Sequence, residues 1–171
     1  MASEVHTHGL GEAYKRKEDA RFIRGQGNYV DGPRKSFAGG AGLLSTARDY
    51  ARFLEMMRNG GAIGSVRILA PRTVDLMTTN QVGTLHSTTG LGFGLGFETT
   101  DRYGAKGMDS VGAFGWAGAY GSVYRVDPKA RLVMVLMIQL LPMTTDLGDR
   151  FANVVYQALV DSPIKRSESV P

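Results

Sequence analysis

The sequence predicts an α+β fold, in which an antiparallel sheet carries a C-terminal helix packed on one face and short helices at one end. Three strand-like runs, at 110–117, 120–127 and 131–139, follow one another with only short turns between them, which is typical of antiparallel strands. Apolar residues at helical spacing come after these runs, and a helix with such a stripe needs another element to cover it. The length of 171 residues corresponds to about one domain.

The composition excludes several classes of protein. The chain has no cysteine, so it can form neither a disulfide nor a cysteine-ligated zinc site. Its net charge of +4 comes from 20 Lys and Arg residues spread among 16 acidic ones, which favours a solvated surface and leaves nucleic-acid binding a minor alternative. The longest apolar run, 132–141, has about half the length of a membrane span, and the N-terminus lacks a signal-peptide segment. We therefore expect no nucleic-acid or membrane partner, and a soluble chain with the cytoplasm as its default compartment.

The two ends of the chain are expected to lie outside the folded domain. Residues 1–42 are polar, rich in glycine and without clear periodicity, which predicts an extended, loop-rich lead. His6 and His8 have a spacing that could suit a metal, but no third ligand is placed to complete a site, so we expect no metal there. The domain itself is expected at 43–161, followed by a disordered tail at 162–171.

Three helices are expected. The first, at 45–58, has apolar residues three and four positions apart, a possible cap at Ser45 or Thr46, and an Asn-Gly-Gly stop. The second, at 71–79, starts with a proline. Its expected packing side is Val74, Leu76 and Met77. The C-terminal helix is expected to begin near Thr145 or Asp146, and its apolar stripe consists of Leu147, Phe151, Val154, Val155, Ala158 and Leu159.

Glycine is dense in the strand region. The run 91–97 alternates glycine with large apolar residues, which predicts a strand near 93–98 with all its bulk on one face. Further glycines stand at every third position of 112–121, and such a density indicates a bulge, or a place where a ligand or another backbone lies against the strand. Alternation places Phe114 and Trp116 on one face of this strand. The stretch 116–122 is therefore the first candidate for a functional site.

Known catalytic motifs are mostly absent. The chain contains no Gly-x-Ser-x-Gly, no His-Glu-x-x-His and no phosphate-binding loop. Ser162-Pro-Ile-Lys165 does match Ser-x-x-Lys, but Pro163 directly follows the serine, beyond the last periodic residue of the C-terminal helix. A helix would not hold Lys165 over the hydroxyl there, so we expect that Ser162 is not a nucleophile.

Five segments, in order along the chain, carry a resemblance to a known family. They are 39–50 (Gly-Gly-Ala-Gly-Leu-Leu-Ser-Thr-Ala-Arg-Asp-Tyr), 67–77, 92–97, 115–122 and 126–128. Together they resemble the C-terminal half of the serine beta-lactamase-like superfamily, nearest to the class C beta-lactamase-related esterases called family VIII carboxylesterases. The resemblance covers about residues 39–161 and implies a partial beta-lactamase or transpeptidase-like fold.

The resemblance implies only part of an active site. In this family an acyl-enzyme forms on the serine of Ser-x-x-Lys, and a Tyr-x-Asn segment supplies a second base; apart from 162–165, the chain contains neither. Trp116, Ala117 and Gly118 occupy the place of a Lys-Thr-Gly segment, and the N–H of Ala119 would be one oxyanion donor. Tryptophan offers an apolar face where lysine offers a charge, which suits a neutral ester or amide substrate. We expect the C-terminal portion of a serine hydrolase, inactive alone, with no catalytic residue, cofactor or metal of its own.

One alternative function stands beside this interpretation, and the role of Trp116 has an alternative of its own. The chain could be a non-catalytic binding or self-associating module built on half of the fold. In either case we expect it to associate with another copy or with a complementary N-terminal half, because strand edges and apolar surface would lack their cover. From the residues alone, Trp116 is more simply a strand aromatic packed on the C-terminal helix. The resemblance favours a substrate-facing wall made with Gly118 and Ala119.

Overall fold

The computed structural model describes residues 45–140 and 144–159. The elements below all lie within residues 47–157. Three helices are present in the described segments: α2 (Ala47–Arg58), α3 (Pro71–Thr78) and α4 (Leu147–Gln157). The strands are β1 (Ala62–Ile63), β2 (Val66–Arg67), β3 (Leu91–Phe93), β4 (Glu98–Thr100), β5 (Phe114–Ala117), β6 (Val123–Asp127) and β7 (Leu132–Leu136).

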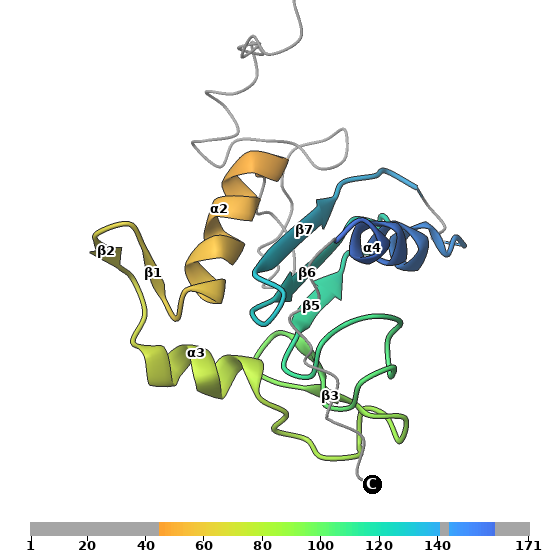
Figure 1. Ribbon diagram of the computed structural model, residues 1–171, viewed down its shortest axis with the longest axis horizontal. Helices are drawn as coiled ribbons and strands as arrows, with labels where there is room; N and C mark the ends of the chain where they lie inside the picture. Colours follow the sequence, from red (N-terminus) through yellow and green to blue (C-terminus); the bar gives the residue numbers. More distant parts are fainter. Residues whose placement is uncertain (1–44, 141–143, 160–171) are drawn as a thin grey trace, which may run out of the picture. The chain divides into compact units, whose positions relative to one another are not determined.

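The strands β3 to β7 form one five-stranded sheet in sequence order, and every neighbouring pair is antiparallel. This confirms the α+β class with an antiparallel sheet (Figure 1). Across the sheet, Glu98 of β4 pairs with Gly115 of β5, which pairs in turn with Arg125 of β6. The small hairpin of β1 and β2, between α2 and α3, was not foreseen from the sequence.

The two long helices cover opposite faces of the sheet. Tyr50 of α2 packs edge-on against Tyr124 of β6, with ring centroids 5.2 Å apart. On the other face, the backbone of Gly148 in α4 approaches the side chain of Val123. Successive residues of a strand point to opposite faces, so Tyr124 and Val123 separate the two helices. The prediction of a C-terminal helix packed on one face of the sheet is therefore confirmed.

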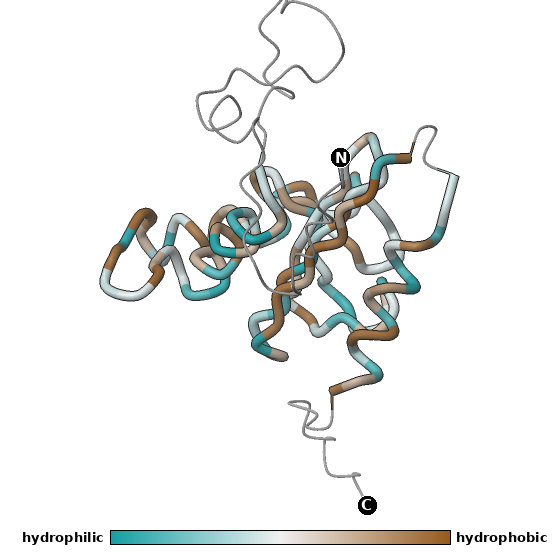
Figure 2. Tube along the Cα trace, turned by 90° about the horizontal axis from the view of Figure 1, so that it is seen from above, coloured by the Kyte–Doolittle hydropathy of each residue, from teal (hydrophilic) through white to brown (hydrophobic). Residues whose placement is uncertain are grey.

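The hydrophobic core lies between α2, α3 and the sheet. Its buried members are Leu54, Met56, Met57, Val74, Phe97, Phe114 and Val126. Figure 2 shows hydrophobic and hydrophilic residues interspersed along the described chain, as expected where one face of each element is covered. The expected packing side of α3 was right for Val74 and wrong for Leu76, which is exposed. Among the described residues, no helix has both the length and the apolar character needed to cross a membrane.

The apolar stripe predicted for α4 is only partly buried. Tyr156 is the buried side chain of this helix, and its hydroxyl donates a hydrogen bond of 2.9 Å to Asp127. Leu147 and Leu159 are exposed, and Val154 has 64% of its surface accessible. Phe151 and Val155 are partly buried, so within the described part of the chain the apolar side of α4 is only partly covered.

The strand predicted near 93–98 is wrong as one element, because β3 ends at Phe93 and β4 begins at Glu98. The intervening residues close a turn, in which the N–H of Gly94 donates to the carbonyl of Phe97 and Gly96 adopts a φ of 94°. A left-handed residue of this kind interrupts a strand, which explains why alternation with glycine misled the prediction. The next three strands exist where predicted, but turns shorten them to Phe114–Ala117, Val123–Asp127 and Leu132–Leu136.

Several predictions concern residues outside the described segments. These are the loop-rich lead at 1–42 with His6 and His8, the match at Ser162 and Lys165, and the tail at 162–171. They stay predictions. The helix predicted at 45–58 is present at Ala47–Arg58, and Thr145 lies at the start of α4, where its hydroxyl accepts a hydrogen bond from the N–H of Leu147 at 3.2 Å.

Candidate functional site

The candidate stretch lies at the end of β5 and in the turn that leads to β6. The N–H of Gly118 donates to the carbonyl of Ser122 at 2.7 Å, which closes the turn. The hydroxyl of Ser122 donates to the carbonyl of Ile138 at 3.0 Å. The N–H of Leu140 donates to the carbonyl of Tyr120 at 2.9 Å. The chain that follows β7 therefore holds this turn in place.

Ala119 lies at the exposed tip of the turn. Within the described segments, its N–H makes no hydrogen bond, whereas that of its neighbour Gly118 is engaged with Ser122. A free backbone donor at a fixed turn is the group that an oxyanion site requires. The role of Ala119 as an oxyanion donor stays a prediction, and its N–H is available for it.

Trp116 is half-exposed, with 43% of its surface accessible. Its indole packs edge-on against Phe93, at a centroid distance of 4.8 Å, and its other ring neighbour is His86, at 6.2 Å. Its register partner in β6 is Tyr124, and Trp116 also lines the cavity described below. Two residues earlier in the same strand, Phe114 is 1% exposed and packs on Phe97. The two aromatic residues thus have different surroundings, one in the core and one at its edge.

A charged cluster that the sequence did not predict lies beside this wall. Glu98 accepts hydrogen bonds from Lys106, from Arg125 at 3.0 Å and from the Nε2 of His86 at 3.1 Å. Burial alone would raise the pKa of Glu98, but the hydrogen bonds from Lys106 and His86 outweigh it and lower the pKa to about 2. Glu98 is therefore an ionised carboxylate that orients His86. The register of β4, β5 and β6 brings Arg125 to Glu98, while His86 and Lys106 reach it from the loops before β3 and after β4.

Gly115 allows this cluster to form across the sheet. A Cβ on Gly115 would lie 2.2 Å from the carbonyl oxygen of Tyr124 and 2.9 Å from the Cδ of Arg125. The Arg125 side chain crosses the bare backbone of β5 and reaches Glu98 on β4. The sequence predicted that another group lies against this glycine-rich strand. At Gly115 that group is the neighbouring strand β6 with the side chain of Arg125.

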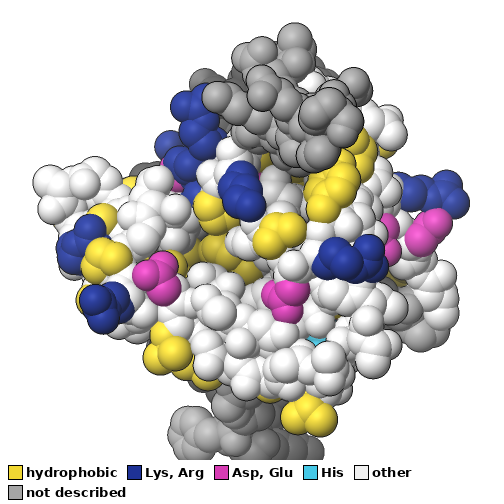
Figure 3. All heavy atoms as spheres, turned by 60° about the horizontal axis from the view of Figure 1, so that its bottom comes forward, with side chains coloured by type: hydrophobic (Ala, Val, Ile, Leu, Met, Phe, Trp, Pro, Cys, Tyr) yellow, Lys and Arg dark blue, Asp and Glu magenta, His cyan; other side chains and the backbone are white. Residues whose placement is uncertain are grey.

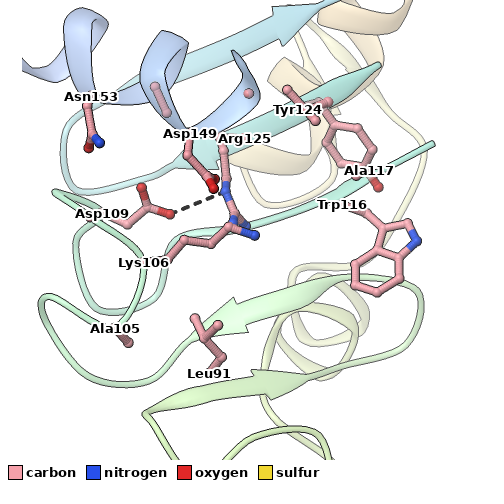
Figure 4. A pocket seen from close by; sticks show the side chains of 14 residues that line it. Leu91, Ala105, Lys106, Asp109, Trp116, Ala117, Tyr124, Arg125, Asp149 and Asn153 are labelled. Carbon is pink, nitrogen blue, oxygen red and sulfur yellow. Dashed lines mark ion pairs between the residues drawn. The ribbon is translucent and has the colours of Figure 1, made fainter. Parts of the chain in front are cut away.

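A cavity of about 410 Å³ lies between β5, β6, α4 and the loop 105–109. Figure 4 shows the side chains that line it. Trp116 and Ala117 lie at one side of it, while Arg125, Lys106 and Asp109 lie at the other. Arg125 pairs with Asp109 at 3.4 Å, and its Nη1 is buried without a hydrogen-bond partner in the described chain. The described segments contain no group of three His, Cys, Asp or Glu residues placed to hold a metal ion.

The buried carboxylate of Asp127 fixes the loop that leads into β5. Asp127 accepts hydrogen bonds from the N–H of Ser110 at 3.0 Å and from the hydroxyl of Tyr156 at 2.9 Å. Burial raises the pKa of the neighbouring Asp109, against the effect of Arg125. These contacts join loop, sheet and α4, and we assign them a structural role.

On the face that Figure 3 shows, basic, acidic and hydrophobic side chains are interspersed.

The described chain thus has an α+β fold, in which an antiparallel sheet carries the C-terminal helix on one face. The sequence profile of the family Beta-lactamase matches residues 5–159. The chain belongs to this family, and with it to the serine beta-lactamase-like superfamily of hydrolases.

Three relatives support this placement. An uncharacterized protein of Mycobacterium tuberculosis is 38% identical over 116 residues, which cover 60% of this chain and 29% of that protein. A putative D-alanyl-D-alanine carboxypeptidase of Escherichia coli is 30% identical over 100 residues, 58% of this chain and 23% of that protein. The solved structure of EstCE1, a hydrolase with promiscuous acyltransferase activity, superposes with a TM-score of 0.59 at 31% identity, over 69% of this chain and 31% of EstCE1. The chain thus spans less than a third of each.

Proposed function

We propose that this chain supplies the C-terminal portion of a serine acyl-hydrolase site of the family VIII carboxylesterase type, and that it is inactive alone. EstCE1 is a hydrolase and the Escherichia coli relative a putative carboxypeptidase, and the segment matched covers only 31% of the first and 23% of the second. The chain has no Tyr-x-Asn, and its one Ser-x-x-Lys match contains Pro163. Nucleophile and base would therefore come from a complementary N-terminal portion.

The observation that carries the proposal is the N–H of Ala119, which has no hydrogen-bond partner among the described residues, three positions after the half-exposed Trp116. In the complete site the Ala119 N–H would stabilise the oxyanion of the tetrahedral intermediate, together with the N–H of the nucleophilic serine. One such donor contributes about 3–4 kcal/mol to transition-state stabilisation. Trp116 would bind the apolar part of a neutral ester or amide, because it carries no charge that could pair with a substrate carboxylate.

A chimera tests the proposal. The third of EstCE1 that matches this chain is replaced by the chain, and the hydrolysis of a short-chain aryl ester and labelling by a fluorophosphonate are measured. We expect no labelling or turnover for the chain alone, and both for the chimera. Ala119→Pro, which deletes the N–H, should abolish turnover, whereas Ala119→Ser should retain it.

The controls separate catalysis from folding. Circular dichroism should be the same for both Ala119 variants, and Trp116→Ala should lower turnover without unfolding the chimera. A folded chimera that is inactive, or one whose turnover survives Ala119→Pro, would contradict the proposal.

One observation favours a second candidate, a non-catalytic module that associates through α4. The exposed Leu147 and Val154 are seven positions apart, so both lie on one side of this helix. Such an uncovered apolar side is typical of a contact surface. A chimera without activity, combined with dimerisation of the chain that Val154→Asp abolishes, would favour this candidate.

A further inference from the structure

The loop between α3 and β3 brings an additional polar group to the Trp116 wall. His86 lies in this loop, and its ring packs near Phe93, at a centroid distance of 5.2 Å, and near Trp116, at 6.2 Å. With the edge-on contact between Phe93 and Trp116, the three rings form one continuous aromatic group. His86 keeps 27% of its side chain exposed, so this group is open to a ligand at two of its three rings, His86 and Trp116.

The hydrogen bond to Glu98 determines the tautomer of His86. Glu98 is ionised, with a pKa near 2, and an ionised carboxylate only accepts hydrogen bonds. The Nε2 of His86, 3.1 Å away, must therefore carry the hydrogen. In the neutral imidazole the other nitrogen, Nδ1, is then an acceptor. Nδ1 makes no hydrogen bond to any residue in the described segments.

Glu98 is itself held firmly, so the orientation of His86 is well determined. Lys106 and Arg125 both donate to Glu98, and the side chain of Arg125 is buried. Three donors around one buried carboxylate leave it little freedom to rotate. A histidine fixed in this way presents its free acceptor in one direction, which is the condition for selecting between ligands.

We propose that His86 is a specificity-determining residue of the Trp116 wall, which selects substrates with an amide N–H next to an apolar group. This rests on the proposed acyl-hydrolase function. The aromatic rings would bind the apolar group, and the Nδ1 of His86 would accept a hydrogen bond from the N–H. An ester places an oxygen where the amide has its N–H, and two acceptors facing each other form no hydrogen bond. The site therefore prefers amides to esters of the same shape.

The only tryptophan of the chain is Trp116, which makes the test direct. In the ¹⁵N-labelled chain, its indole N–H gives a single side-chain signal that reports on this wall. N-benzylacetamide has an N–H where benzyl acetate has its ester oxygen, and the two compounds are otherwise the same. They are titrated separately. One hydrogen bond between neutral groups corresponds to about a threefold to tenfold lower Kd, so we expect the amide to bind tighter by that factor.

Three variants test whether His86 causes the preference for the amide. His86→Phe keeps a ring and removes the acceptor, so the preference for the amide should disappear while both ligands still shift the indole signal. His86→Asn keeps an acceptor close to the position of Nδ1 and should retain part of the preference. Leu85→Ala changes an exposed neighbour and should leave the preference intact.

The outcomes separate the two proposals. If both ligands bind at Trp116 with equal affinity, or if His86→Phe retains the preference, the role of His86 is overturned and the substrate wall stands. If neither ligand shifts the indole signal at millimolar concentration, the wall itself is refuted, and the role of His86 with it.

Discussion

Replacing each of two aromatic residues of β5 by alanine distinguishes a core side chain from an exposed wall. Phe114 is 1% exposed and belongs to the core cluster, whereas Trp116 is 43% exposed and touches only the rings of Phe93 and His86 among the aromatic contacts of the described chain. The two positions share a strand and a face, so secondary-structure propensity affects both alike. Burial alone separates them.

The expected costs follow from that difference. Removing a fully buried phenylalanine loses its transfer free energy and leaves a cavity, at a cost of about 3–5 kcal/mol. Trp116→Ala loses one edge-on aromatic contact, about 0.5–1.5 kcal/mol, and some partly buried apolar surface, but leaves no closed cavity. We expect a cost of about 1–2 kcal/mol for Trp116→Ala.

The assay is urea unfolding, followed by far-ultraviolet circular dichroism because one variant lacks tryptophan. Native chain, Trp116→Ala and Phe114→Ala are compared at one protein concentration, and the midpoints are converted with a common slope. If Trp116→Ala destabilises the chain as much as Phe114→Ala does, Trp116 is a core residue, and the substrate wall built on it has no basis.

Three further predictions concern packing, pH and association. Gly115→Ala should destabilise the chain by about 1–3 kcal/mol, because the added Cβ would lie 2.2 Å from a backbone oxygen. Gly118→Ala is the control, because its Cβ would have its nearest atom at 3.7 Å, and it should change the melting temperature little. Equal effects of the two substitutions would contradict the close approach at Gly115. The pKa of Glu98 is lowered in the fold from 4.5 to about 2, so its ionisation stabilises the fold above pH 4.5, and this stabilisation is lost as the pH falls towards 2. The free energy of unfolding should therefore depend less on pH in this range in Glu98→Gln. An unchanged pH dependence would contradict the lowered pKa of Glu98. The exposed apolar side of α4, with Leu147 and Val154, should make the isolated chain a dimer or larger species in analytical ultracentrifugation, and a concentration-independent monomer would argue otherwise.

Local pattern was enough for the elements and for the family. The periodicity of 45–58, the proline at the start of α3 and the turn signals between β5, β6 and β7 all act over a few residues, and each predicted element type was found. The prediction of a strand from the sequence pattern was wrong where two local signals competed. The alternating run 91–97 suits a strand by its spacing, but its glycines also permit the turn at 94–97 that the packed structure adopts.

The candidate stretch 116–122 was found from the sequence because glycine density and the order of the family segments are both linear features. The cluster of His86, Glu98, Lys106 and Arg125 was not, because Arg125 meets Glu98 through the register of β4, β5 and β6, and His86 and Lys106 reach Glu98 from two loops whose path the sequence pattern does not predict. The burial of Glu98 and the exposure of Trp116 likewise depend on which face each neighbour covers, and α4 covered less of the sheet than its apolar stripe suggested. The sequence determined the class of fold and the stretch that carries the candidate site, because both depend on patterns of residues that are close together in the sequence. Tertiary structure alone decided the charged cluster, the tautomer of His86 and the opening beside Trp116, because these arise from contacts between segments that are distant along the chain.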